Sequence, residues 1–178
     1  RHQARAFERF STRDAPARPT IVTTGTGSGK TESFLVPLLD HAARAKARGE
    51  PGIKAIVLYP MNALVSDPGR RIPEYLHDDA RLHQVTAGVY IGGEGNRSTQ
   101  AREHLVDSRR VLRDEPPDIL LTNYKMLDLL LRTEDAPLWA ALFQQCCAGC
   151  ITVRGALPWN LPLRRYARRL SSITRPLC

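Results

Sequence analysis

A glycine-rich segment that ends in Gly-Lys-Thr constrains the fold of this chain more than any other part of the sequence. The β-branched residues 21–24 lead into it, and residues 34–43 follow it with apolar side chains at helical spacing. Glycines let the backbone bend so that successive N–H groups point inward, and a following helix adds the positive end of its dipole. We therefore predict a strand, a phosphate-binding loop and a helix in that order, with Pro37 as an irregularity in the helix.

The residues of this loop have separate expected roles. Lys30 would reach the β- and γ-phosphates of a nucleotide, and the Thr31 hydroxyl would ligate Mg²⁺. The strict pattern G-x-x-x-x-G-K-[ST] is not met, because Thr24 stands at its first glycine position. The alternative is a flexible turn between two core elements. The residues expected to hold the nucleotide here are Thr26, Gly27, Ser28, Gly29, Lys30 and Thr31.

Strand-like and helix-like segments alternate along the rest of the chain. The expected strands cover residues 53–59, 85–91 and 118–122, and the expected helices are a short one near the N-terminus, a broken one after Pro68, one over 99–113 and one capped by Asn123. Residues 136–143 would add a further turn or two. This alternation is typical of an α/β fold with a mostly parallel sheet, helices on both faces and ligands at the carboxyl ends of the strands.

Charge is distributed unevenly over the 178 residues. The net charge is +8, and all 18 acidic residues lie in residues 1–135 together with 20 of the 26 basic ones. Residues 136–178 contain six arginines, all four cysteines and no carboxylate. Most of the positive charge that would suggest a polyanionic partner therefore lies in this C-terminal part. No apolar run approaches the ~20 residues of a membrane span, so we expect a soluble cytoplasmic protein with no membrane partner.

The order and spacing of these segments resemble the first RecA-like lobe of superfamily two helicases of the DEAD/DEAH type. Residues 23–39 look like motif I in its helicase-type variant, residues 55–64 look like motif Ia, and residues 118–131 look like motif Ib. Gly92 and Gly93 resemble the paired-glycine element of that lobe, and His2-Gln3 is similar to its adenine-reading glutamine element. The resemblance covers residues 1–143, which we expect to form the N-terminal part of a RecA-like P-loop lobe, with residues 144–178 as an irregular tail outside its core.

The resemblance implies ATP and Mg²⁺ as cofactors and a single strand of nucleic acid, bound without regard to sequence, as the partner. Gln3 would read the adenine edge. Loop amides and helix N-termini bind phosphates without reading bases, which agrees with contacts to a sugar-phosphate backbone. For each such residue the alternative is ordinary capping between a strand and a helix. The residues that would contact the nucleic acid are Pro60, Asn62, Gly92, Gly93, Thr122 and Asn123.

Two departures from the family pattern bear on activity. Pro68 follows Asp67 where related sequences usually continue motif Ia with Asp-Gln. Motif II, which carries an Asp-Glu pair, should follow motif Ib, yet no residue after Asp135 is acidic. Hydrolysis needs carboxylates to orient Mg²⁺ and to activate water. We therefore identify no catalytic residue and expect a truncated nucleotide-binding lobe that does not hydrolyse ATP on its own.

Three interpretations of residues 144–178 remain open. The first, which we favour, is a shifted reading frame or other gene damage that leaves a truncated helicase. The second is a genuine short protein, a non-catalytic nucleic-acid-binding module whose arginine-rich end grips phosphates. The third is a zinc site built on Cys147 and Cys150 with Cys146 and Cys178. A small P-loop kinase would explain the glycine-rich loop but neither residues 122–127 nor the paired glycines.

Overall fold

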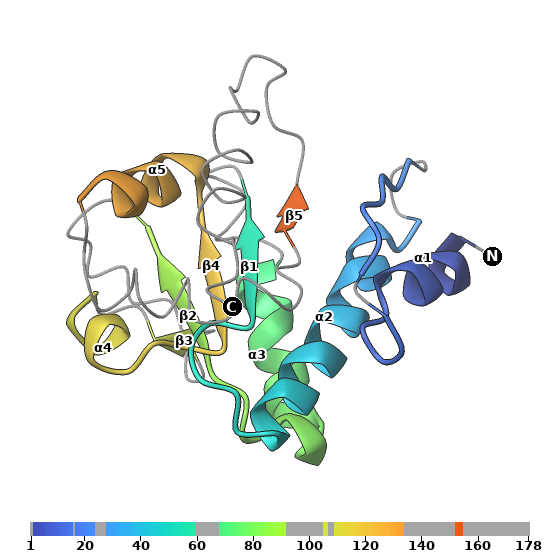
Figure 1. The fold of residues 1–178 in the computed structure, drawn as a ribbon, viewed down its shortest axis with the longest axis horizontal. Coiled ribbons are helices and arrows are strands. Elements are labelled where there is room, and N and C mark those ends of the chain that lie inside the picture. Colours follow the sequence, from blue (N-terminus) through green and yellow to red (C-terminus); the bar gives the residue numbers. More distant parts are fainter. Residues whose placement is uncertain are drawn as a thin grey trace, which may run out of the picture.

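The computed structural model describes residues 2–15, 17–23, 28–59, 68–91, 105–106, 109–133 and 152–154. They form a parallel five-stranded sheet in the order β3-β2-β4-β1-β5 with helices packed around it (Figure 1). The expected α/β fold of the RecA-like type is confirmed. The strands are Ala55–Leu58 (β1), Ala87–Tyr90 (β2), Leu105–Val106 (β3), Ile119–Thr122 (β4) and Thr152–Arg154 (β5). The helices are His2–Phe10 (α1), Lys30–Ala47 (α2), Pro68–Asp78 (α3), Arg109–Asp114 (α4), Tyr124–Thr133 (α5) and the 3₁₀ turn Ala80–Leu82 (η1).

The three central strands, β1, β2 and β4, are buried along their whole length. Ala55 and Ala87 both pair with Ile119, so these strands run in register from their first residues. Successive residues of a strand face opposite sides of the sheet, and two apolar clusters result. On one face Val57 and Leu121 pack with α2 and α3, and on the other Leu120 packs with α4 and α5. Burial on both faces explains why the strands read as unbroken apolar runs in the sequence.

Proline residues are accommodated in two helices without ending them. α3 begins at Pro68, where a missing N–H costs nothing because the first helical amides have no partner inside the helix. The helix continues through Pro73 to Asp78, so the expectation of a broken helix was wrong. α2 likewise continues through Pro37. Each internal proline removes one hydrogen bond, and the buried apolar faces of both helices compensate for that loss.

Two other sequence-based expectations were also wrong. Residues 21–23 join no strand, and Ile21 is 89% exposed. The β-branched run has strand propensity but needs a partner, and β1 is already paired with β4 and β5 on its two edges. Residues 105–106 pair with β2 as strand β3, so the helix expected over 99–113 is limited among the described residues to α4. Long-range pairing, which the local polar pattern does not reveal, decides the conformation there.

The C-terminal part contributes one short segment to the described structure. Thr152–Arg154 forms β5, parallel to residues 56–58 of β1. The other residues from 134 onward lie outside the described ranges, as do the four cysteines, so the division between residues 1–143 and 144–178 stays a prediction. In the described part of the chain, no helix is long and apolar enough to cross a bilayer. Within the same ranges, no three His, Cys, Asp or Glu side chains are grouped so that they could hold a metal.

A buried ion pair ties together the amino ends of β1, β2 and β4. Lys54 Nζ lies 2.8 Å from Asp118 Oδ1, and the two side chains are 4% and 2% exposed. The Thr86 amide donates to Asp118 Oδ2 at 2.8 Å. Lys46, in the last turn of α2, reaches the same carboxylate at 3.2 Å. We call these four residues the Asp118 clip. It joins the starts of three strands, at the sheet edge opposite their carboxyl ends, so it serves the fold rather than a ligand.

Candidate functional site

The start of α2 is built around Gly29, the residue before Lys30. Gly29 adopts a left-handed conformation with φ +74°, and its carbonyl accepts hydrogen bonds from the Ser33 hydroxyl at 3.1 Å and from Gln3 Nε2 at 3.3 Å. A Cβ atom on Gly29 would lie 2.4 Å from Gln3 Nε2. Glycine is therefore favoured by the left-handed backbone, and a side chain at this position would displace the end of Gln3. The structure thus brings together two predicted site residues, Gln3 and Gly29, that lie far apart in the sequence.

The other predicted loop residues are described in part. Lys30 and Thr31 open the 18-residue helix α2 and are half-buried, as is Ser28. Gly29 has no side chain to cap the helix, so the first-turn amides of α2 depend on other acceptors. The N-terminal end of a helix carries partial positive charge and favours anions. Thr26 and Gly27 lie outside the described residues, and their expected role stays a prediction.

The carboxyl ends of the central strands meet at one edge of the sheet, as expected. Leu58 and Tyr90 both pair with Thr122, and the Tyr59 amide donates to the Thr122 carbonyl at 3.1 Å. Tyr59, Ile91 and Asn123, the first residues after β1, β2 and β4, therefore lie at the same edge of the sheet. Of the residues predicted to contact nucleic acid, Thr122 and Asn123 lie at this edge, and Pro60, Asn62, Gly92 and Gly93 lie outside the described residues.

The side chains of Thr122 and Asn123 are buried and make internal contacts. The Thr122 hydroxyl donates to the Tyr90 carbonyl at 2.6 Å. Asn123 Oδ1 accepts from the Met126 amide at 3.0 Å and so caps α5, as the sequence predicted. Asn123 Nδ2 is buried and has no hydrogen-bond partner among the described residues. Asn123 thus acts as a helix cap, while contact of either residue with nucleic acid stays a prediction.

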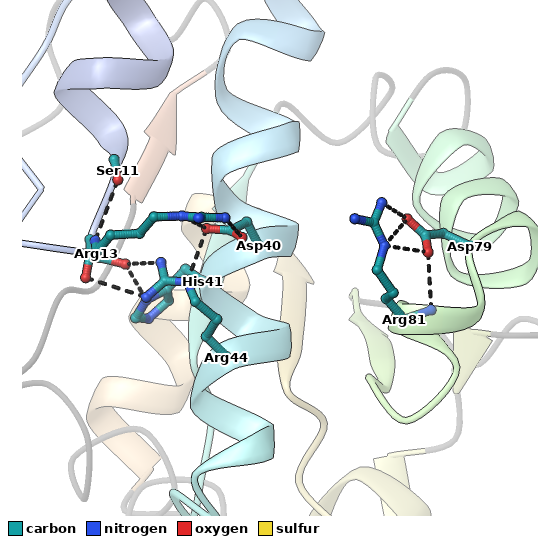
Figure 2. A network of polar contacts seen from close by, with 8 residues as sticks. Ser11, Arg13, Asp40, His41, Arg44, Asp79 and Arg81 are labelled. Atoms are coloured by element: carbon teal, nitrogen blue, oxygen red, sulfur yellow. Dashed lines mark hydrogen bonds and ion pairs between the residues drawn. The ribbon is translucent and has the colours of Figure 1, made fainter.

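A polar network holds the segment after α1 against the middle of α2 (Figure 2). Arg13 Nη2 lies 2.7 Å from Asp40 Oδ1, and Arg44 Nε lies 3.0 Å from Asp40 Oδ2. Burial alone would raise the pKa of Asp40, but the two guanidinium groups outweigh it and lower that pKa. Arg44 also donates to the Thr12 hydroxyl at 2.8 Å, and His41 Nδ1 lies 2.8 Å from the same oxygen. We call these five residues the α1 clamp, because they fix the helix that carries Gln3.

Comparison with protein families identifies the lobe to which this site belongs. A family model described as DEAD/DEAH box helicase matches residues 1–146, which include Gln3, the glycine-rich loop and all of β1 to β4. The chain belongs to the DEAD/DEAH box helicase family. The resemblance inferred from the spacing of the motifs is therefore confirmed.

Individual relatives match shorter stretches of the chain. Druantia protein DruE of Escherichia coli is 40% identical over 119 residues, which are 58% of this chain and 6% of that protein. The ATP-dependent RNA helicase dbp4 of Aspergillus niger is 39% identical over 77 residues, 43% of this chain and 9% of that protein. The ATP-dependent RNA helicase DBP7 of Meyerozyma guilliermondii is 39% identical over 90 residues, 48% of this chain and 12% of that protein. The chain thus spans only a small part of each of these relatives.

One contact at the start of α2 was missed by sequence reasoning. Glu32, in the first turn of α2, forms an ion pair with Arg71 of α3. The residues are 39 positions apart, and nothing in the local sequence pattern links them. A glutamate in the first turn of a helix would ordinarily be assigned to the helix dipole alone.

The α1 clamp predicts a pH dependence of stability. The Thr12 hydroxyl accepts from Arg44 and lies 2.8 Å from His41 Nδ1, where a neutral imidazole can accept the Thr12 proton. Burial and the nearby Arg44 charge lower the pKa of His41 below its ordinary value. The unfolded chain, with a His pKa of about 6.5, then takes up a proton before the folded chain does as the pH falls.

We therefore expect the contribution of His41 to stability to be complete above about pH 6.5 and to be lost as the pH falls through the folded pKa. Urea unfolding at a series of pH values measures this loss. The His41→Asn variant keeps an acceptor for Thr12 but does not titrate, and its stability should change less between pH 7 and 5 than that of the wild type. Equal pH profiles for the two proteins would contradict a neutral His41.

Proposed function

We propose that this chain is the ATP-binding lobe of a helicase that acts on nucleic acid. Membership in the DEAD/DEAH box helicase family supports ATP and Mg²⁺ as its cofactors. The hydrogen bond between Gln3 and the carbonyl of Gly29 carries the proposal, because it sets the predicted adenine-reading residue directly against the start of α2. The left-handed glycine, the N-terminal end of α2 and the adjacent Lys30 fit a phosphate group at this position.

In this proposal each residue of the loop has one task. Gln3 contacts the adenine edge, the amides of residues 26–31 surround the phosphate groups, Lys30 provides positive charge beside them, and Thr31 would hold Mg²⁺. Bound ATP with Mg²⁺ supplies the phosphoanhydride bond whose cleavage drives a helicase. The chain's own contribution is to bind and orient that ligand.

We further propose a single strand of nucleic acid as the partner, bound without regard to sequence. Two of the relatives are named as RNA helicases. The common edge formed by the ends of β1, β2 and β4 supports this proposal, because residues that follow these strands start close together and backbone amides there would be able to meet successive phosphates. The proposed contacts are those of Pro60, Asn62, Gly92, Gly93, Thr122 and Asn123.

Hydrolysis is the activity that we do not assign to residues 1–178 alone. The carboxylates that would orient Mg²⁺ and activate water belong after motif Ib, and no residue after Asp135 is acidic. We propose that this chain binds ATP and does not turn it over by itself. Strand-stimulated ATP turnover by the purified chain, abolished by Lys30→Ala, would refute this part of the proposal.

The Lys30→Ala variant tests nucleotide binding. A hydrogen bond from a charged donor contributes about 1.5–3 kcal/mol, so the variant should bind Mg²⁺–ATP roughly 10- to 150-fold more weakly than the wild type. Isothermal titration calorimetry measures the affinity. Arg48→Ala is the matched control, because Arg48 lies at the opposite end of α2 and should leave binding unchanged. Equal affinities of wild type and Lys30→Ala would reject the nucleotide site.

A non-catalytic nucleic-acid-binding module is the second candidate, favoured by the six arginines and absent carboxylates of residues 136–178. It predicts salt-sensitive binding to single strands that survives Lys30→Ala. Binding should weaken when the chain is shortened after Arg154, which leaves β5 in place. If binding of single-stranded nucleic acid requires Lys30 and is unchanged by this truncation, the binding-module candidate is rejected.

A further inference from the structure

The Glu32–Arg71 ion pair places two opposite charges beside the phosphate loop. Glu32 is the second residue after Lys30, and its Oε2 atom lies 3.3 Å from the point where a Cβ on Gly29 would stand. Arg71 of α3 pairs with the other oxygen of this carboxylate. The side chains are 34% exposed for Arg71 and 26% for Glu32, so solvent screens the pair only in part.

The sign of the Glu32 charge opposes the ligand proposed for this loop. Phosphate groups next to Gly29 would meet a carboxylate close to the backbone that holds them, and like charges repel over several ångströms at a partly buried site. A guanidinium on that carboxylate cancels most of the repulsion. The cancellation matters more for a triphosphate than for a diphosphate, because the triphosphate carries one more negative charge.

We propose that Arg71 is a specificity-determining residue that neutralises Glu32 and thereby permits tight binding of nucleoside triphosphates. The inference rests on the proposed nucleotide site and assigns a function to a contact between α2 and α3. Because Arg71 belongs to α3, any movement of α3 away from α2 lowers the affinity for the triphosphate more than that for the diphosphate. The pair therefore links the position of α3 to the choice of nucleotide.

The test compares two probes, the non-hydrolysable triphosphate adenylyl imidodiphosphate and ADP, each with Mg²⁺, by calorimetry on the full chain. Arg71→Gln should weaken binding of the triphosphate analogue about three- to tenfold and that of ADP by less, with a larger effect at low salt. Adding Glu32→Gln to Arg71→Gln should restore both affinities. Arg71→Lys, which keeps the charge, should bind nearly as well as the wild type.

A matched control separates this role from the stability of the helices. Arg81→Gln removes an exposed ion pair with Asp79, just after α3, and should not change either affinity. Thermal unfolding of every variant reports whether the fold is kept. Equal weakening of both nucleotides by Arg71→Gln, or no recovery when Glu32→Gln is added, would show a merely structural contact and overturn the inference.

Failure of the inference can be told apart from failure of the proposed function. If Lys30→Ala loses binding and the charge variants behave like the wild type, only the role of Arg71 is rejected. If the wild type binds neither nucleotide, or binds both as well as Lys30→Ala does, the nucleotide site is rejected and the role of Arg71 with it.

Discussion

The Asp118→Asn variant should be less stable than the wild type by about 3–5 kcal/mol, the usual effect of removing one partner from a buried ion pair. The substitution keeps the shape of the side chain but leaves the Lys54 ammonium, which is 4% exposed, without a compensating charge. It also weakens the bonds from the Thr86 amide and hydroxyl. Urea unfolding followed by circular dichroism gives the free energy of unfolding.

Two further variants test this explanation. Lys46→Gln removes the half-exposed partner of Asp118 and should cost about 1 kcal/mol or less. Combining Asp118→Asn with Lys54→Met removes the Lys54 charge that has lost its partner, and should recover much of the lost stability. If Asp118→Asn stays within about 1 kcal/mol of the wild type, the Asp118 clip does not hold the three strands as described.

The loss of stability at acid pH should also change in the Asp118→Asn variant. Burial alone would raise the pKa of Asp118, but the hydrogen bonds from Lys54 and Thr86 and the Lys54 charge outweigh it and lower that pKa. The stability that Asp118 contributes is therefore present above its unfolded pKa of about 3.9 and lost as the pH falls through the folded value. Asp118→Asn should remove this part of the acid dependence.

The second large effect is expected for Gly29→Ala. A non-glycine residue at φ +74° costs about 1–2 kcal/mol, and the added methyl group would lie 2.4 Å from Gln3 Nε2. The Gln3 side chain must move away from the added methyl group, so the hydrogen bond between Gln3 and the Gly29 carbonyl is lost. We expect a total destabilisation of about 2–4 kcal/mol, at the high end for one substitution, together with loss of nucleotide binding.

Gly49→Ala provides a matched control for the backbone strain alone. Gly49 has φ +70°, close to that of Gly29, but a Cβ atom there would meet nothing within 4 Å. The difference in unfolding free energy between the two variants therefore measures the collision with Gln3. Adding Gln3→Ala to Gly29→Ala should remove that difference, and equal values for Gly29→Ala and Gly49→Ala would show that Gln3 does not press on the loop.

Local sequence patterns were sufficient for the elements whose stability is mainly local or whose burial is complete. The apolar runs at 55–58 and 119–122 formed central strands, and Asn123 capped the helix that follows. The local pattern predicted the wrong secondary structure where the conformation depends on pairing with a distant strand. Residues 21–23 have strand-forming side chains but pair with no strand that the structure describes. Residues 105–106 lie within a stretch predicted to be helical, yet they form a strand beside β2.

The features of the candidate site also fall into those that local sequence predicts and those that only the tertiary structure reveals. The sequence alone determined that a glycine turn precedes a helix starting at Lys30 and that the chain belongs to the DEAD/DEAH box helicase family, because these depend on residues close together or on fixed spacing. Only the tertiary structure decided that Gln3 reaches Gly29, that Glu32 meets Arg71 and that Asp118 joins three strands. Those contacts link residues 26 to 64 positions apart, and the packing of α1, α3 and the strands selects them among many possible partners.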